Sequence, residues 1–188
     1  MLDVLENPLT EEYMQLKQHI LSADFPLHWV HATCNGDTDN EDVPYLSHAI
    51  LRRSDAEKDG SGTGSPIVGS PVFDRTRVVF DQILDHNDVG RRCFYRMNVN
   101  MTMPSPQRMS TSHTDHSYPH TNVLIYLNGF DGGHTWVGGV EGPQPTEDMV
   151  VSFNGVPHQA APPLDNRRMV LLATYGEDED TTSWVEVE

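Results

Sequence analysis

The chain has 188 residues, of which 37% are hydrophobic and 21% are charged, and its formal net charge is −16. This length suits one domain with a substantial core. The negative charge disfavours nucleic acid as a partner, because phosphate backbones repel it. The first residues lack the pattern of a secretory signal, and no apolar run approaches the roughly 20 residues of a membrane span. Two cysteines cannot build a disulfide framework, so we expect a cytoplasmic protein with reduced thiols.

The first part of the chain, residues 1–90, is predicted to be mainly helical. Segment 10–23 begins with a residue that can cap a helix and carries apolar residues at helical spacing, and segment 74–86 repeats that spacing. Between them, the apolar segment 25–30 is predicted to be extended. Segment 54–71 is rich in glycine, serine and charge, which predicts a long loop that is either a lid over a site or disordered.

From residue 91 to residue 176 the pattern changes to short apolar runs separated by Asn-Gly and Gly-Gly turns. This pattern predicts a mainly β fold, either a sandwich, a jelly roll or a barrel. The acidic tail 177–188 follows, with a further short strand expected at Trp184 and Val185. We therefore expect a single domain over residues 1–188, with strands at 93–101, 122–127, 135–137, 149–153 and 169–175.

Two His-x-Asp pairs occur, at His86 with Asp88 and at His113 with Asp115. The first lies at the end of a predicted helix, where the helix dipole favours a histidine. The second enters the β-rich part, where residues two apart point to the same side and can meet one cation. His158, which follows the next predicted strand and turn, is the expected third ligand. Two histidines and one carboxylate with open positions are typical of non-haem Fe(II) oxygenases, whereas structural zinc takes four protein ligands.

Arg168 opens the last strong strand, ten positions after His158. An arginine that enters the interior of a small barrel needs an anionic partner, because its burial is otherwise costly. A carboxylate of a small diacid matches the two-pronged guanidinium best. Arg167 would then point the other way. A surface position for one or both arginines is the alternative.

The segment from His113 to Tyr175 resembles the 2-oxoglutarate- and Fe(II)-dependent oxygenases, in particular the prolyl-4-hydroxylase-like branch with its phage and viral members. His113 and Asp115 of the run HTD, together with the later His158, match the metal ligands of that family. The run LIYLN resembles a strand whose tyrosine, here Tyr126, contributes to cosubstrate binding. The run MVVSFNGVPH resembles the strand that leads to the distal histidine, and Arg168 matches the basic residue that pairs with 2-oxoglutarate.

Two further stretches extend the resemblance. GGHTWV resembles the Gly-Gly-Glu-Thr segment of the family, with His134 in place of the glutamate and Thr135 as an expected cosubstrate contact. FYRMNVNM resembles the strand before the metal-binding loop in phage-type members, where Asn100 would face the cosubstrate. We expect His116 and His120 either to support the ligands from behind or to lie on the surface.

The resemblance implies a double-stranded β-helix, or jelly roll, with the N-terminal helices packed outside. It also implies Fe(II), 2-oxoglutarate and O2 as cofactor and cosubstrates, and hydroxylation of a substrate with release of succinate and CO2. A peptidyl proline or a small molecule would be that substrate. If the chain is viral, the expected compartment is the host cytoplasm.

Two other functions remain open from the sequence. A cupin-like metal enzyme would use His113 and His158 without 2-oxoglutarate, and would have no need for Arg168 in its interior. A non-enzymatic jelly-roll binding module would leave the triad without a metal. The oligomeric state cannot be inferred from these patterns.

Overall fold

The computed structural model describes residues 2–31, 43–54, 64–90, 92–105 and 109–177. Residues 55–63 of the predicted loop 54–71 and the predicted strand at Trp184 and Val185 lie outside these residues.

The described residues form two helices and eleven strands, all of whose pairings are antiparallel, which confirms the predicted mainly β fold. The helices are α1 (Glu11–Ile20) and α3 (Phe73–His86). The strands are β1 (Leu2–Leu5), β2 (His28–Val30), β3 (Tyr45–Arg52), β4 (Ile67–Val68), β5 (Arg92–Thr102), β6 (Thr121–Tyr126), β7 (Thr135–Val137), β8 (Val140–Glu141), β9 (Val150–Asn154), β10 (His158–Ala160) and β11 (Arg168–Glu177).

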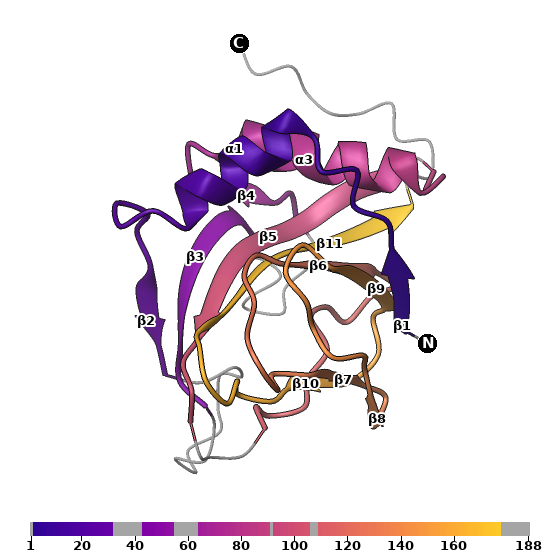
Figure 1. Cartoon of the computed structure of the whole chain (residues 1–188). Coiled ribbons are helices and arrows are strands. Elements are labelled where there is room, and N and C mark those ends of the chain that lie inside the picture. The colour runs from indigo at the N-terminus through magenta and orange to yellow at the C-terminus, as the bar shows by residue number, and fades with distance from the viewer. Residues whose placement is uncertain (1, 32–42, 55–63, 91, 106–108, 178–188) are drawn as a thin grey trace.

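The strands form two sheets. The larger sheet has the order β1-β9-β6-β11-β5-β3-β2, with β4 paired to β3, and the smaller sheet has the order β10-β7-β8. Figure 1 shows the two helices over one side of the larger sheet and the smaller sheet on its other side. The non-consecutive strand order and the two facing sheets are those of a jelly roll.

The segment before residue 91 supplies strands as well as helices, which corrects the prediction of a mainly helical support. Strand β3 pairs with β5 and so belongs to the larger sheet. Its residues are buried or half-buried on both faces, apart from the exposed Arg52 at its end. A strand covered on both sides shows no clean alternation of apolar and polar residues. The pattern that predicts a strand was therefore absent from this segment.

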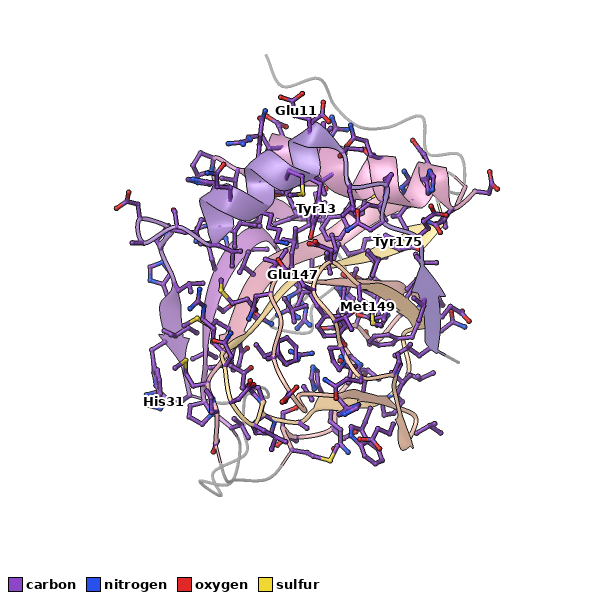
Figure 2. The ribbon with its side chains drawn as sticks, viewed as in Figure 1. Glu11, Tyr13, His31, Glu147, Met149 and Tyr175 are labelled. Carbon is purple, nitrogen blue, oxygen red and sulfur yellow. The ribbon has the colours of Figure 1, made fainter. Side chains whose placement is uncertain are left out.

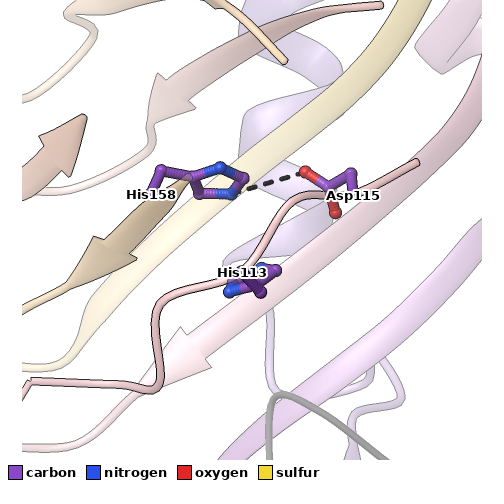
Figure 3. A group of neighbouring side chains, drawn as sticks. All are labelled: His113, Asp115 and His158. Atoms are coloured by element: carbon purple, nitrogen blue, oxygen red, sulfur yellow. Dashed lines mark ion pairs between the residues drawn. The ribbon is translucent and has the colours of Figure 1, made fainter. Parts of the chain in front are cut away.

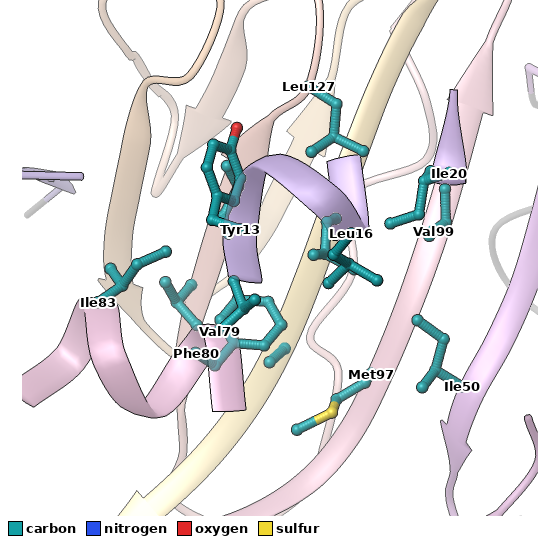
Figure 4. Close-up of a cluster of buried hydrophobic side chains, with 14 of the residues drawn as sticks. Tyr13, Leu16, Ile20, Ile50, Val79, Phe80, Ile83, Met97, Val99 and Leu127 are labelled. Atoms are coloured by element: carbon teal, nitrogen blue, oxygen red, sulfur yellow. The ribbon is translucent and has the colours of Figure 1, made fainter. Parts of the chain in front are cut away.

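Strand β6 shows how the larger sheet separates two cores. Val123 and Ile125 pack in the cluster that includes both helices, whereas Leu124 and Tyr126 pack in the cluster on the other side of the sheet. Figure 4 shows the helix-side cluster, where residues of α1 and α3 such as Leu16 and Phe80 lie over the sheet. Because successive side chains of a strand point to opposite faces, one sheet serves both cores.

The two helices begin and end close to the predicted positions. The Thr10 hydroxyl caps α1 by accepting the backbone N–H of Tyr13 at 3.3 Å, and Glu11 and Glu12 lie in its first turn. Neither described helix has the length and apolar character of a membrane-spanning segment.

Candidate metal centre and cavity

His113, Asp115 and His158 come together although they are far apart in the chain. Each offers a ligand atom, and these atoms all lie within 4.8 Å of one another (Figure 3). His158 is the first residue of β10, and His113 pairs with it through an isolated β-bridge. The backbone therefore sets the position of both histidines.

Hydrogen bonds also fix which ring nitrogen of each histidine faces the centre. Nδ1 of His113 lies 3.0 Å from the Thr111 carbonyl oxygen, and Nδ1 of His158 lies 3.1 Å from the Val156 carbonyl oxygen. Each Nδ1–H donates to its carbonyl, which leaves Nε2 as the bare nitrogen that can bind a metal. Nε2 of His158 is 3.4 Å from Oδ2 of Asp115, as the dashed line in Figure 3 marks.

Asp115 is held as an anion in a buried position. Its exposed fraction is 6%, and Arg96 Nη1 and Arg53 Nη2 both donate hydrogen bonds to Oδ1. Burial alone would raise the pKa of Asp115, but its electrostatic interactions with Arg96, His158, His113 and Arg53 outweigh this effect and hold the pKa well below its ordinary value. Oδ2 then remains as the ligand oxygen.

Burial lowers the pKa of His158, against the opposite effect of Asp115. A neutral imidazole is the form that binds a metal. Two imidazole nitrogens and one carboxylate oxygen are a donor set that fits Fe(II) in a facial arrangement with open positions. The residues present therefore fit the metal that the sequence predicts.

The three ligands line a cavity of about 480 Å³ between the two sheets. Thr135 from the smaller sheet and Asn100, Leu124 and Val170 from the larger sheet also line it. A pocket of roughly 300–1,000 Å³ is typical of small-molecule sites. The cavity is thus large enough for a ligand beside the metal.

Arg168 lines the same cavity and is only 5% exposed. Its Nε donates to the Gly133 carbonyl at 3.0 Å and its Nη2 to the Thr135 hydroxyl at 3.0 Å. Among the described residues no carboxylate forms an ion pair with it, and burial lowers the pKa of its guanidinium. Arg167, in contrast, is exposed. The buried guanidinium of Arg168 is therefore in the cavity with only uncharged hydrogen-bond acceptors among the described residues.

The other predicted cosubstrate contacts lie at different depths. Thr135 and Asn100 line the cavity, and Asn100 Oδ1 accepts a hydrogen bond from the Ser47 hydroxyl at 2.7 Å. Tyr126 is absent from the described cavity lining. Its hydroxyl lies 2.8 Å from the Thr135 hydroxyl, and its ring lies 5.4 Å from the Arg168 guanidinium carbon. Tyr126 thus supports two cavity residues from behind.

The remaining histidines near the triad contact groups outside the cavity lining. His116 is buried, and its Nε2 lies 2.7 Å from the Thr174 hydroxyl. His120 is also buried, with Nδ1 2.8 Å from the Tyr118 carbonyl oxygen. His134 lies 3.1 Å from the Gly142 carbonyl oxygen through Nδ1.

Sequence reasoning missed Arg96, which contacts the metal ligand Asp115 directly. A signal was present: in RMNVN, Arg96, Asn98 and Asn100 alternate with the buried apolar Met97 and Val99. A period of two places the polar residues on one face of β5, which is the cavity face for Arg96 and Asn100. Three polar residues on the inner face of a jelly roll indicate a site.

Comparisons with solved structures show the same fold over nearly the whole chain. A 2OG-Fe(II) oxygenase family oxidoreductase from Burkholderia pseudomallei matches with a TM-score of 0.62 at 19% identity, covering 93% of this chain and 84% of that one. A Trichoplax adhaerens prolyl hydroxylase, solved with a peptide fragment of hypoxia inducible factor, matches with a TM-score of 0.59 at 15% identity, covering 95% and 84%.

A viral collagen prolyl hydroxylase from Paramecium bursaria Chlorella virus 1, solved with 2-oxoglutarate, matches with a TM-score of 0.54 at 11% identity, covering 93% and 96%. No family model matches the chain, and no curated protein matches it in sequence. At these identities the comparisons establish the fold, and at that level they confirm the resemblance to the 2-oxoglutarate oxygenases and their prolyl hydroxylases.

Proposed function

We propose that the chain is an Fe(II)- and 2-oxoglutarate-dependent oxygenase that hydroxylates a peptide or small-molecule substrate. The observation that carries this proposal is the position of Arg168. It is buried in the same cavity as a complete His-Asp-His triad, without a carboxylate partner among the described residues. A buried guanidinium requires an anion, and a cosubstrate with a second carboxylate supplies one. A cupin-like enzyme without 2-oxoglutarate would have no use for this group.

Each part of the site then has a role. His113, Asp115 and His158 would hold Fe(II), which together with 2-oxoglutarate supplies O2-dependent hydroxylation with release of succinate and CO2. Arg168 would bind the far carboxylate of 2-oxoglutarate, with Thr135 beside it. Arg96 keeps Asp115 anionic, and the backbone carbonyls behind both histidines keep Nε2 available for the metal.

Two substrate classes have support. The solved structures with this fold include prolyl hydroxylases, one of them bound to a peptide, which supports a peptidyl proline. The volume of the cavity supports a small molecule as well. The fold alone does not choose between them, because one fold carries many substrates.

The test is an anaerobic titration of the metal-free protein with Fe(II) and then 2-oxoglutarate, followed through the visible charge-transfer band of the iron chelate. The wild type should form the band. Arg168→Ala should need about 10- to 100-fold more 2-oxoglutarate, since a hydrogen-bonded ion pair is lost. Arg167→Ala removes the neighbouring exposed arginine and should titrate like the wild type. Asp115→Ala should fail to form the band.

The absence of a band in folded protein with bound iron would contradict the use of 2-oxoglutarate and favour a cupin-like enzyme. The absence of iron binding would favour a binding module. Once the band is established, release of succinate in air can be screened with proline-containing peptides and with small molecules.

A further inference from the structure

Arg96 has a donor group that its protein contacts do not use. Its Nε donates to Asn98 Oδ1 at 3.2 Å, and its Nη1 donates to Asp115 Oδ1. Nη2 has no hydrogen-bond partner among the described residues, and Arg96 lines the cavity beside the metal ligands. The two protein contacts hold the guanidinium in one orientation. The position of Nη2 is therefore set before a ligand binds.

Asn122 provides a second unused donor on the same wall. Its exposed fraction is 2%, it lines the cavity, and its Nδ2 has no hydrogen-bond partner among the described residues. Thr174 lies on β11, between β5 and β6. It pairs directly with Arg96 of β5 and directly with Asn122 of β6. Opposed residues of neighbouring strands point to the same face, so Arg96 and Asn122 flank Thr174 on one row of the sheet. A buried amide without a partner is costly unless a ligand accepts from it.

The charge of the cavity favours a negatively charged ligand in addition to the cosubstrate. Arg96 and Arg168 are positive and Asp115 is negative, and the charges of Fe(II) and the 2-oxoglutarate dianion cancel each other. The cavity therefore keeps a net charge of one positive unit, before the further positive charge of Arg53 in its lining is added. The whole chain has a net charge of −16, so this local excess is opposite in sign to the surface. A second anion in the cavity would balance it.

We propose that the substrate is a small carboxylic acid whose carboxylate binds between Arg96 Nη2 and Asn122 Nδ2. Both groups are donors, so their ligand must offer acceptor oxygens, and a carboxylate offers two. A free amino acid meets this requirement, whereas a proline inside a peptide chain has an amide in place of the carboxylate. The inference rests on the proposed function, since it places this acid beside the 2-oxoglutarate-bound metal.

The test uses propionate and propionamide, which have similar shapes and differ in charge. Each is titrated by calorimetry into the anaerobic complex of the protein with Fe(II) and saturating 2-oxoglutarate. Propionate should bind to the wild type and propionamide should not. Arg96→Gln and Asn122→Asp should each weaken propionate binding by about 10- to 100-fold, through loss of a charge-assisted hydrogen bond or through repulsion. Arg77→Gln removes an exposed arginine from α3 and should bind propionate like the wild type.

The charge-transfer band separates failure of this inference from failure of the proposed function. A wild type without the band refutes the proposed function before propionate is added. A wild type with the band that does not bind propionate, or binds propionamide equally, refutes the carboxylate site. Unchanged propionate binding in both variants also refutes it, because propionate would then bind elsewhere. Arg96→Gln also removes the contact with Asp115 and so can lose the charge-transfer band. In that case propionate binding by Asn122→Asp decides the test.

Discussion

His113 and His158 exchange backbone hydrogen bonds, with N–H to carbonyl distances of 3.0 and 2.9 Å. Their ring centroids lie 4.5 Å apart. The two ligands are thus fixed relative to each other by the backbone, through the same double hydrogen bond that pairs residues of antiparallel strands. Because this pairing uses no side-chain atom, a ligand ring can be removed without removing the structure that holds the other ligand.

His158→Ala should therefore abolish tight Fe(II) binding while leaving the fold intact. Removal of a group that hydrogen-bonds a metal ligand typically weakens metal binding by about 10- to 100-fold. His158→Ala should weaken Fe(II) binding by more than this, because a ligand itself is lost. His86→Ala is the matched control, since His86 belongs to the other His-x-Asp pair and is exposed at the end of α3. Anaerobic Fe(II) titration and thermal unfolding measure the two effects. Equal iron affinity in wild type and His158→Ala would place the metal elsewhere.

Asp115 should make the stability of the metal-free protein depend on acid pH. Its folded pKa is depressed, so its contribution to the free energy of unfolding is present above about pH 4, the unfolded value, and is lost as pH falls toward the folded pKa. Asp115→Asn removes that contribution and should lower the free energy of unfolding at neutral pH by roughly 1.5–3 kcal/mol. The difference from wild type should shrink in acid.

Urea unfolding of both proteins across acid and neutral pH measures this difference. Asp24→Asn, at an exposed position, is the control for loss of one negative charge and should unfold like the wild type. A difference between wild type and Asp115→Asn that stays constant with pH would show that the carboxylate charge does not stabilise the fold.

The sequence predicted those parts of the structure in which local pattern and burial agree. Segment 135–137 was predicted as a strand and is β7, and segment 74–86 corresponds to α3 within one residue. The three predicted metal ligands do meet. The segment that carries His113 and Asp115 is not a strand, as the expected period of two assumed, but is held to β10 by the isolated bridge between His113 and His158.

The parts that were missed depend on contacts between distant segments. The two-sided burial of β3 arises only when α1, α3 and the rest of the sheet are in place. The alternation in β5 places Arg96 on the cavity face, but its contact with Asp115 depends on how the loop that carries Asp115 packs against β5. The position of Tyr126 behind Thr135 likewise follows from the packing of the smaller sheet against the larger one.

Lys17 should stabilise the attachment of α1 to the loop before β9. Its buried Nζ lies 2.6 Å from Glu147 and 2.6 Å from Asp148, whose carboxylate also accepts a hydrogen bond from Tyr13. Figure 2 shows Tyr13 on α1 above the loop that carries Glu147. Lys17→Met should lower the free energy of unfolding by roughly 1.5–3 kcal/mol, because it leaves Asp148 without its cation. Gln18→Met, on the exposed side of α1, should have little effect.

The pH dependence of this effect has the opposite sign to that of Asp115. Burial lowers the pKa of Lys17, but the hydrogen bonds that its ammonium donates to Asp148 and Glu147 outweigh this effect and raise the pKa above its ordinary value. Its contribution is then fully present below about pH 10, the unfolded value, and is lost as pH rises through the folded pKa. Denaturant unfolding at neutral and alkaline pH should show the difference from Lys17→Met shrinking only in alkali. A difference that is absent at neutral pH would refute the role of the ion pair.

Gly133 and Gly138 form a matched pair for testing the cosubstrate pocket. Both have φ in the left-handed region, +63° and +59°. A Cβ at Gly133 would lie 2.6 Å from a ring carbon of Phe130 and 3.2 Å from Cδ of Arg168, whereas a Cβ at Gly138 meets nothing within 4 Å. Alanine at either position should cost about 1–2 kcal/mol of backbone strain. Only Gly133→Ala should displace Phe130 and Arg168.

Gly133→Ala should therefore weaken 2-oxoglutarate binding by about tenfold or more, since the Gly133 carbonyl also accepts the Nε–H of Arg168. Gly138→Ala should bind 2-oxoglutarate like the wild type, and its unfolding temperature should fall through backbone strain alone. The charge-transfer band measures the affinity and thermal unfolding measures the strain. If both variants lost affinity equally, the loss would follow from reduced stability and not from the displaced guanidinium. If neither lost affinity, the added Cβ at Gly133 would not displace Arg168 from the far carboxylate, and the prediction would be wrong.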